Sequence, residues 1–246
     1  LMFGFTEDGK GVLYDEEAET VTVCSDTTAA FSAESVPEKN GEIFIGWYNE
    51  NGEAVQNGDA LLAGDVLSAR FVSVDTKADF SVIGAQIRLS GTEGLRFINE
   101  MSMPLFNTLK QSDIVLVQKV ESDETNSGCG FIILPKDFLA DGEILTADTE
   151  KVQRVAAKKI FAADENAFRY TVCVTDIAVE NYARRYAVRP YIAYTNANGT
   201  ACMAYGEQYA ASLADIAEAA LEDQNAALTE DERTRLEEFA AAKSGT

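Results

Sequence analysis

Histidine is absent from this sequence of 246 residues, and that absence narrows the range of functions more than any feature that is present. Histidine is the commonest general base near neutral pH, the usual base of a catalytic triad and the commonest zinc ligand. Enzymes and zinc sites that depend on it are therefore not expected. Carboxylate catalysis of the glycosidase kind, hard-cation sites built from oxygen, and lysine or tyrosine chemistry remain open.

Cysteine is scarce and scattered. The four cysteines are separated by dozens of residues, which leaves no Cys-x-x-Cys pair or other close metal-ligand spacing, and no metal is expected. Each lies in an apolar or β-like run, where a free cysteine behaves as a small hydrophobic residue, but a Cys129–Cys173 or Cys173–Cys202 bridge stays open. The four are Cys24, Cys129, Cys173 and Cys202.

Motifs that bind phosphates or build a nucleophile are also missing. The sequence has no GxGxxG, Walker A, GxSxG or HExxH pattern, so no cofactor and no catalytic residue is predicted. Its longest β-like apolar cores, at 114–117 and 131–134, are far shorter than the roughly 20 apolar residues of a membrane span. Membrane insertion is therefore not expected.

Basic residues are few, since 20 Lys and Arg stand against 41 Asp and Glu, for a net charge of -21. Such a surface repels phosphate backbones and anionic lipid headgroups, so nucleic acid and membranes are not expected as partners. An acidic balance by itself indicates only a well solvated exterior. The chain is nevertheless 46% hydrophobic, which is enough to fill a core.

Short β-like runs separated by turns make up the first 75 residues. Strands are expected at 19–23, 43–48 and 66–72. Asn51-Gly52 separates an aromatic strand from Glu53-Ala54-Val55, which predicts a hairpin with a type I′ turn, because both central residues of that turn need positive φ. Further turns are expected at Asn40-Gly41, Asn57-Gly58 and Gly64-Asp65.

The stretch IFIGWYNENGEAVQNGDALLAGDVLSARF resembles the internalin-type B-repeat, also called the Listeria-Bacteroides repeat. The shared pattern is an apolar residue, then Gly-Trp-Tyr, a turn and a closing strand, and the resemblance covers roughly residues 18–72. Ser68 stands where the family usually has tyrosine, and an upstream glycine pair is missing. The resemblance implies a small β-grasp-like module that serves bacterial surface proteins as a spacer or protein-interaction unit.

Residues 73–79 are polar and are expected to form a linker to a second domain that starts near residue 80. A hairpin is expected over 82–98, and a capping box at Thr229 and Glu232 predicts a final helix through Phe239, after which residues 243–246 should fray. Further strands are expected at 113–120, 130–134, 168–174, 187–194 and 200–205, and helices at 149–162, 176–185 and 213–221.

Three segments of this second region are similar to an uncharacterised domain that recurs in large secreted and surface proteins of gut Firmicutes. They are GAQIRLSGTEGLRF, GCGFIILPKDFL and RPYIAYTNANGTACMAYGEQYAASLADIAEAAL, and the similarity covers residues 80–224. The similarity implies a secreted or surface location, in proteins that often also contain repeats, dockerins or hydrolases. It carries no catalytic residues to this chain.

Arg88 and Arg96 flank the predicted hairpin turn and are the first candidates for ligand binding. Two guanidinium groups that return to one region can bind a carboxylate or sulfate. The alternative is that each arginine pairs with an internal acid, such as Glu93 or Glu100, and fixes the hairpin.

Exposed aromatic rings are the second kind of candidate, because sugar rings stack on them. Trp47, in its Gly-Trp-Tyr context, is more often a core residue of the repeat. In Tyr191-Ile192-Ala193-Tyr194 the two tyrosines point to opposite faces of a strand, which argues against a flat two-ring platform. The aromatic candidates are Trp47, Tyr48, Tyr191, Tyr194 and Tyr205.

Three other features are weaker. A glycosidase needs two carboxyl groups about 5 to 10 Å apart, and no local motif singles out such a pair. The acidic loop 121–126 lacks the spacing of a calcium loop and is expected to be a solvated hairpin loop. The mixed basic and aromatic patch 182–186 is weak evidence for nucleic acid in so acidic a chain.

The sequence therefore predicts an α+β, mainly β chain of two domains. Residues 1–75 form a small β-grasp-like repeat domain, and residues 80–246 form a larger β-sandwich-like domain with C-terminal helices. The expected function is non-enzymatic: attachment, spacing or ligand display in a larger secreted bacterial protein, extracellular or at the cell wall, with a surface protein, a glycan or other domains of the same polypeptide as partner. The alternatives are a carbohydrate-binding module beside a glycan-degrading enzyme, and a carboxylate-based glycoside hydrolase.

Overall fold

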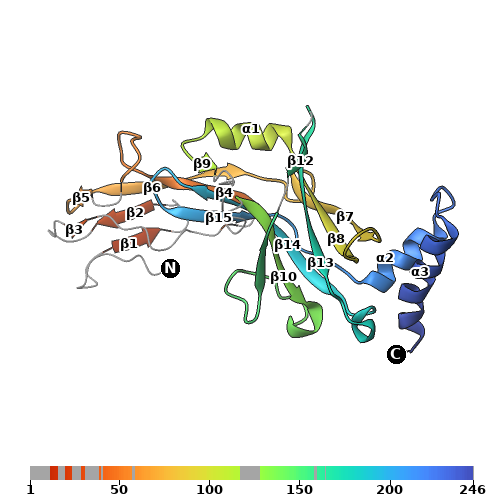
Figure 1. The fold of residues 1–246 in the computed structure, drawn as a ribbon. Coiled ribbons are helices and arrows are strands. Elements are labelled where there is room, and N and C mark those ends of the chain that lie inside the picture. Colours follow the sequence, from red (N-terminus) through yellow and green to blue (C-terminus); the bar gives the residue numbers. More distant parts are fainter. Residues whose placement is uncertain are drawn as a thin grey trace. The chain divides into compact units, whose positions relative to one another are not determined.

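The computed structural model describes residues 12–15, 20–23, 29–30, 39, 41–56, 59–116, 128–157, 160–163 and 165–245. It is mainly β, with antiparallel sheets and two α-helices near the C-terminus, as the sequence predicts (Figure 1). The chain divides into two compact units. Unit 1 comprises residues 1–75, 104–118 and 192–204, and unit 2 comprises 76–103, 119–191 and 205–246.

Unit 1 is built on a four-stranded antiparallel sheet in the order β1-β2-β6-β4. Its strands are β1 (Val12–Asp15), β2 (Thr20–Val23), β6 (Val66–Ser73) and β4 (Glu42–Tyr48). Two short strands, β3 (Ala29–Ala30) and β5 (Ala60–Leu61), form a separate pair. The strands expected at 43–48 and 66–72 are confirmed, and the described part of 19–23 is strand β2.

The hairpin at Asn51-Gly52 is confirmed, but its predicted turn type is wrong. Only Gly52 has positive φ, 79°. Its N–H donates to the Asn49 carbonyl at 2.9 Å, and the Asn49 N–H donates to the Glu53 carbonyl at 2.9 Å. This is the pattern of a type I turn followed by a glycine bulge, a three-residue loop in which Asn51 keeps ordinary dihedrals. Asn57-Gly58, Asn40, Cys24 and the acidic loop 121–126 lie outside the described residues.

The second Asn-Gly hairpin has the same turn geometry. Gly199 has φ 79°, and its N–H donates to the Asn196 carbonyl at 3.0 Å. The Asn196 side chain accepts hydrogen bonds from the N–H groups of Asn198 and Thr200 at 3.0 and 2.9 Å. This turn joins β14 (Tyr186–Thr195) to β15 (Ala201–Tyr205), and β9 (Val115–Leu116) pairs with the end of β14.

Unit 2 contains a sheet in the order β12-β13-β8-β7 and much of a second sheet, in which β11, β10 and β14 are neighbours and β16 also pairs with β14. The first sheet comprises β12 (Ile160–Ala163), β13 (Ala167–Thr175), β8 (Gly94–Ser102) and β7 (Phe80–Arg88), and the second includes β11 (Gln153–Ala156), β10 (Cys129–Pro135) and β16 (Tyr209–Ala211). Phe131 of β10 contacts Phe97 of β8 and Tyr170 of β13, with ring centroids 6.4 and 5.7 Å apart. These contacts between two sheets are the packing of a sandwich-like core.

Most of the strands expected in the second region are confirmed, namely those in 82–98 and at 130–134, 168–174, 187–194 and 200–205. Of the strand expected at 113–120, the described part contains β9. The helix expected at 149–162 is wrong, because this segment forms β11 and β12. The spacing of its apolar residues fits both the helical period of about 3.6 residues and the strand period of two. Pairing of β11 with β10 favours the strand. The helix expected at 176–185 is only the 3-10 turn Val179–Asn181.

The C-terminal helices are α2 (Leu213–Glu222) and α3 (Glu230–Ala241), and both begin with a complete capping box. Helix α1 (Met103–Gln111) and the 3-10 turn Lys136–Phe138 are not predicted by the sequence analysis. Helix α2 contacts α3 and β7, and its buried residues are Leu213, Ala214 and Ala217. Leu213 and Ala217 belong to the predicted apolar face, whereas Ile216, Ala220 and Leu221 of that face are only partly buried.

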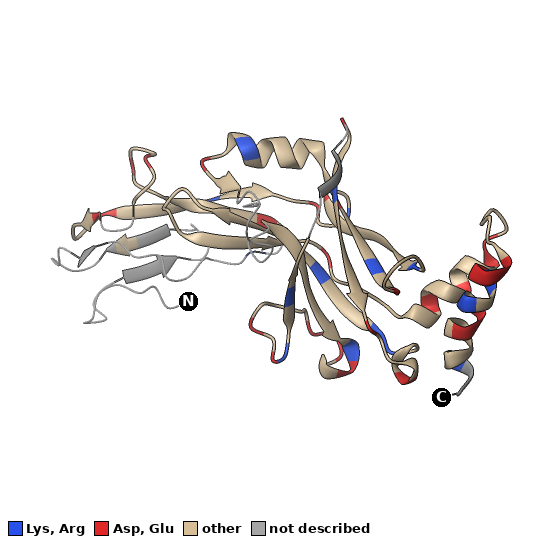
Figure 2. Cartoon of the chain, in the orientation of Figure 1, with Lys and Arg blue, Asp and Glu red and all other residues tan. Residues whose placement is uncertain are grey.

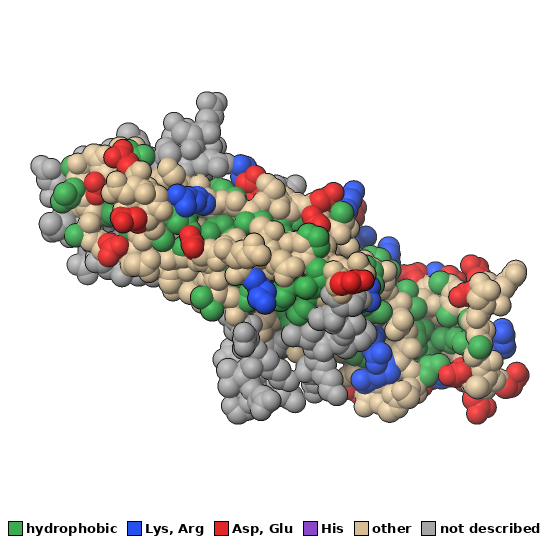
Figure 3. Space-filling view, turned by 90° about the horizontal axis from the view of Figure 1, so that it is seen from above, with side chains coloured by type: hydrophobic (Ala, Val, Ile, Leu, Met, Phe, Trp, Pro, Cys, Tyr) green, Lys and Arg blue, Asp and Glu red, His purple; other side chains and the backbone are tan. Residues whose placement is uncertain are grey.

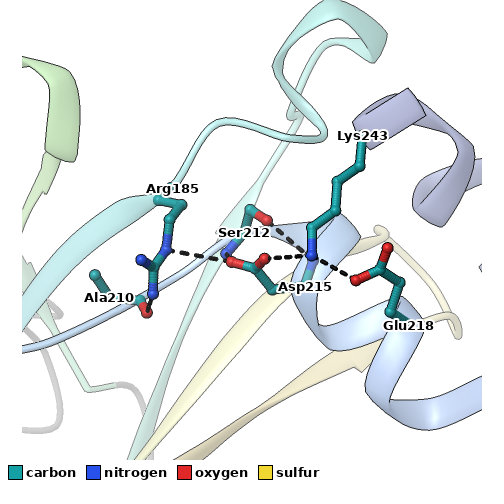
Figure 4. A network of polar contacts seen from close by, with 6 residues as sticks. All are labelled: Arg185, Ala210, Ser212, Asp215, Glu218 and Lys243. Atoms are coloured by element: carbon teal, nitrogen blue, oxygen red, sulfur yellow. Dashed lines mark hydrogen bonds and ion pairs between the residues drawn. The ribbon is translucent and has the colours of Figure 1, made fainter. Parts of the chain in front are cut away.

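Lys243 does not belong to a frayed tail, contrary to the prediction. Its ammonium group is paired with Asp215 at 2.8 Å and also with Glu218, and Asp215 is paired with Arg185 at 3.2 Å (Figure 4). Burial alone would raise the pKa of Asp215, but hydrogen bonds from Lys243 and Ser212 outweigh burial and lower it. The network ties the 3-10 turn Ala242–Gly245 to the start of α2.

Helix α3 is tied to the turn between β7 and β8 by Arg235. Its guanidinium donates to both carboxylate oxygens of Glu93, with the shortest N–O distance 2.6 Å, and it lies 4.4 Å from the centroid of the Phe239 ring. The hydrogen bonds from Arg235 lower the pKa of Glu93 below its ordinary value of 4.5. The pair is therefore a pH-dependent contribution to stability.

We expect Glu93→Gln to lower the free energy of unfolding by about 1 kcal/mol near pH 7, a modest value because both side chains are partly exposed. Since the folded state lowers the pKa of Glu93, this contribution is present above the ordinary pKa and is lost as the pH falls through the folded-state value. Urea unfolding at pH 7 and at about pH 3 checks this, with the exposed Glu237→Gln on α3 as control. A difference between wild type and Glu93→Gln that persists in acid contradicts it.

Candidate functional site

Trp47 and Tyr48 of the Gly-Trp-Tyr sequence lie in the core of unit 1, with exposed fractions of 1% and 2%. The Trp47 ring packs edge-on against Phe44, with centroids 5.6 Å apart. The Tyr48 hydroxyl donates to Asp113 at 2.9 Å, and Arg70 lies 3.8 Å from the centroid of its ring. Burial, together with the hydrogen bond to Asp113, raises the pKa of Tyr48 to about 12. Neither ring is exposed for stacking on a sugar.

Tyr194 joins the same core, with 1% exposure, and its hydroxyl donates to the Phe44 carbonyl at 2.7 Å. Beside it, the buried Asn198 side chain binds the hairpin that follows β4. Its Oδ1 accepts from the Trp47 N–H at 2.8 Å, and its Nδ2 donates to the carbonyls of Trp47 and Val55 at 2.8 and 2.6 Å. In the sequence, Asn198 stands out only as part of an Asn-Gly turn pair, but in the folded chain its side chain closes the unit 1 core.

Tyr191 and Tyr205 lie apart from that cluster. Tyr191 is fully buried in unit 2, where Arg154 lies 4.7 Å from its ring centroid. Tyr205, the last residue of β15, is partly exposed, and Arg189 lies 4.9 Å from its ring centroid. The structure therefore brings Trp47, Tyr48 and Tyr194 together as core residues, and it places no two of the five aromatic candidates in an exposed platform among the described residues.

Arg88 and Arg96 share one face of the β7–β8 hairpin. Arg96 is opposite Gln86 on β7 and opposite Cys173 on β13, whereas Arg88 is opposite Gly94. Gly94 and Arg96 are two residues apart on β8 and so face the same side. Arg88 and Arg96 are therefore diagonal neighbours, a relation that usually separates Cβ atoms by about 7 to 8 Å.

The two acids expected from the sequence as partners of Arg88 and Arg96 form ion pairs with other arginines. Glu93 binds Arg235, and Glu100 binds Arg169 at 2.6 Å. The Arg88 Nε donates to the Thr92 carbonyl at 2.6 Å, which leaves its two terminal nitrogens without a partner among the described residues. Arg96, which is partly buried, has neither a hydrogen bond nor an ion pair to any residue in the described ranges. Internal pairing with Glu93 or Glu100 is thus not what holds these two arginines.

Cys173 on β13 lies on the same face as the two arginines. A Cβ built on Gly94 would come within 2.9 Å of the Cys173 Sγ, so the sulfur lies over Gly94, next to Arg96 and across Gly94 from Arg88. Burial raises the pKa of the Cys173 thiol, and the nearby charges of Arg88 and Arg96 oppose that rise. Cys129, Cys173 and Cys202 are all free thiols, so the Cys129–Cys173 and Cys173–Cys202 bridges that the sequence leaves open do not form.

A cleft of about 300 Å³ lies elsewhere in unit 2, on the face of β13 that points toward β10 and β11, away from the two arginines, and no local motif in the sequence indicates it. It lies among β10, β11 and the end of β13, and its polar lining comprises Lys151, Gln153, Cys173, Thr175 and Tyr186. None of the described residues that line it is an Asp or a Glu. The cleft is assembled from strands and loops that are far apart in the sequence, so only the folded chain reveals it.

The acids close to the two arginines have other partners. Asp and Glu are concentrated on α2 and α3, and acidic side chains are prominent on the surface in the space-filling view (Figures 2 and 3). Near the arginines, Glu93 is neutralised by Arg235, and Asp176 accepts a hydrogen bond from the Thr175 hydroxyl at 3.0 Å. Neither Arg88 nor Arg96 therefore has an ion pair to an Asp or Glu among the described residues.

No metal-binding cluster of Cys, Asp or Glu occurs among the described residues. In the same part of the chain, every helix is too short or too polar to span a bilayer. No family model matches the chain, and a search of the curated proteins finds no match. The resemblances to the B-repeat and to the surface-protein domain therefore remain predictions.

Proposed function

We propose that this chain is a non-enzymatic extracellular module for attachment, spacing or ligand display within a larger secreted bacterial protein, and that it binds an anionic ligand through Arg88 and Arg96. Arg96 carries this proposal. The partly buried Arg96 guanidinium has no partner within the described ranges, so among those residues it gives up hydration without gaining an ion pair or hydrogen bond. In a chain with 41 acidic residues, a carboxylate or sulfate from outside supplies the missing partner.

A second hollow in unit 2 is lined by carboxylates, and the pKa of one of them argues for binding rather than hydrolysis. It has a volume of about 200 Å³ and is lined by Glu93 and Asp176, among other residues. A glycosidase needs a general acid whose pKa is raised, but Arg235 lowers the pKa of Glu93. This environment keeps Glu93 ionised, so it is suited to structure and not to proton donation.

The experiment compares the variant Arg88→Gln/Arg96→Gln with wild type for binding to immobilised dextran sulfate, polygalacturonate and polyglutamate, with neutral dextran as the uncharged reference. At physiological ionic strength the Debye length is about 8 Å, so distant acids of the protein are largely screened. We expect wild type to bind at least one anionic polymer and the double variant to bind it at least about tenfold more weakly.

Arg233→Gln is the matched control, because Arg233 is an exposed arginine of α3 and its loss changes the net charge in the same direction. It should bind as wild type does. Equal binding by wild type and the double variant, or no binding to any of the three polyanions, contradicts the proposed function. Turnover of a probe that is abolished by a single substitution would contradict its non-enzymatic character.

A further inference from the structure

We propose that the open edge of β13 accepts an extended peptide segment of a partner protein as an added strand, with apolar side chains of the peptide in the cleft between the two sheets. Residues 171–175 form this open edge. The peptide site is separate from the anion site, because it uses neither Arg88 nor Arg96.

Strand β13 has a neighbouring strand along only part of one side. On one side, β8 pairs with it over its whole length, from Ala167 to Thr175. On the other side, β12 pairs with it only at Phe168 and Tyr170, and β11, which precedes β12 in the sequence, pairs with β10 of the second sheet. Among the described residues, the N–H and C=O groups of the open edge that face away from β8 therefore have no strand partner.

The cleft lies along this open edge. Its lining includes the three consecutive residues 173–175. Since consecutive side chains of a strand point to opposite faces, a cleft that touches all three borders the backbone edge of the strand. Val155 of β11 is paired with Phe131, whose ring contacts the other sheet, so Val155 and Ile133 face into the sandwich and form an apolar floor.

The sequence of the open edge favours the addition of a strand. Residues 171–175 are Thr-Val-Cys-Val-Thr, which is rich in β-branched residues and contains no charged residue and no proline. Natural sheets usually protect an edge with lysine, proline or a bulge, and the pairing of these residues with β8 is regular. An extended peptide can therefore pair with the backbone of the open edge while every second side chain enters the cleft.

The dimensions and charges favour a single peptide strand over a second copy of this chain. The open edge spans residues 171–175, about 17 Å, and ends where β12 begins to pair, at Tyr170. A stable dimer buries at least about 1,200 Å², so it would have to extend well beyond this edge, and it would bring together two chains of net charge -21.

The lining of the cleft indicates apolar side chains for the peptide. Its volume of about 300 Å³ has room for a few side chains of one strand. Lys151 of the lining is already paired with Glu150 at 3.6 Å, whereas Ile133, Val155 and Val174 offer apolar contacts. The partner segment therefore alternates apolar residues, which enter the cleft, with residues that point away from it.

Calorimetric titration of the full chain with the peptide acetyl-Lys-Thr-Val-Thr-Val-Thr-Lys-amide tests the site. We expect saturable, submillimolar binding. Serine in place of both valines should weaken it at least about tenfold, because two apolar side chains leave the cleft. N-methylation of the two valines and N-methylation of two threonines block opposite edges of the peptide, so one should weaken binding at least about tenfold and the other less than about threefold. All these peptides carry the same charge.

Hydrogen exchange of the backbone amides measures strand addition directly. When the chain is saturated with the parent peptide, those amides of residues 171–175 that face away from β8 should exchange at least about tenfold more slowly, because they gain a hydrogen bond. The amides of β7, the other outer strand of the same sheet, are the control and should keep their rates. Binding that leaves every amide of 171–175 unchanged overturns the proposed strand addition.

The variant Val155→Thr/Val174→Thr keeps β-branched side chains but makes the cleft more polar, and it should bind the peptide about fivefold to tenfold more weakly. Val115→Thr, at an exposed valine of β9, is the matched control and should bind as wild type does. Arg88→Gln/Arg96→Gln should also bind the peptide as wild type does. Urea unfolding shows whether each variant is folded.

Three results overturn the peptide site: no saturable binding of the parent peptide, equal binding of the serine peptide, or equal binding by the Val155→Thr/Val174→Thr variant. A wild-type dimer in sedimentation that this variant abolishes also overturns it, because a second copy then occupies the edge. Each of these results leaves the proposed anion binding intact, and a failure of polyanion binding leaves the peptide site intact.

Discussion

Asn198→Ala is expected to lower the free energy of unfolding of unit 1 by about 3 kcal/mol. The side chain of Asn198 makes buried hydrogen bonds to the Trp47 N–H and to the carbonyls of Trp47 and Val55. Truncation removes all three bonds at once and leaves a hole where the amide was. Each group that loses a buried hydrogen-bond partner costs about 1 to 3 kcal/mol, so the total loss is large for a single substitution in a turn.

Urea unfolding followed by tryptophan fluorescence measures this effect directly, because Trp47 is the single tryptophan and it contacts Asn198. The control is Asn51→Ala. Asn51 precedes glycine in a turn of the same geometry, but its side chain is exposed, and the change should cost less than about 0.5 kcal/mol. Similar losses for the two variants would contradict the account of the unit 1 core.

Gly46→Ala is expected to be the second most damaging change, with a loss of about 3 kcal/mol. Gly46 lies at a bulge in β4, where its φ is 155°. An added Cβ would also come within 2.9 Å of the Ala197 Cβ and of the Asn198 Oδ1. Alanine therefore brings both backbone strain and a collision with the turn that closes the core.

Gly84→Ala separates these two causes. Gly84 lies at a bulge in β7, its φ is 156°, and no atom lies within 4 Å of an added Cβ. Only the strain remains there, so we expect a loss of about 1 kcal/mol. Calorimetric unfolding of the two variants measures the difference. Equal losses would show that the approach of Asn198 to Gly46 does not determine the stability of unit 1.

Local patterns predict much of the fold, because strands and capped helices depend on residues that are close in the sequence. The hairpin of β7 and β8 and the capping box at Thr229 are examples. Where one segment satisfies two periods, local patterns fail. Residues 149–162 have a helical spacing of apolar residues, but the open edge of β10 takes β11 as a partner, and no feature of the segment itself reveals this choice.

The candidate site likewise depends partly on local sequence and partly on long-range contacts. That Arg88 and Arg96 lie on one face follows from their positions around a hairpin turn. That they have no acidic partner in the described part of the chain does not follow from local sequence, because Glu93 binds Arg235, 142 residues away, and Glu100 binds Arg169, 69 residues away. Likewise, the Gly-Trp-Tyr sequence indicates buried aromatic residues, but its contact with Asn198 spans 151 residues. Long-range pairing decides which side chains remain available to a ligand.

The most direct test of the central claim is an NMR titration that follows the Nε–Hε signals of the arginine side chains as dextran sulfate or polygalacturonate is added. The account predicts that the signals of Arg88 and Arg96 shift together and saturate, while that of Arg233 stays in place. Shifts of equal size at Arg233, or no shift at Arg96 while the polyanion binds, would contradict an anion site on the β7–β8 hairpin.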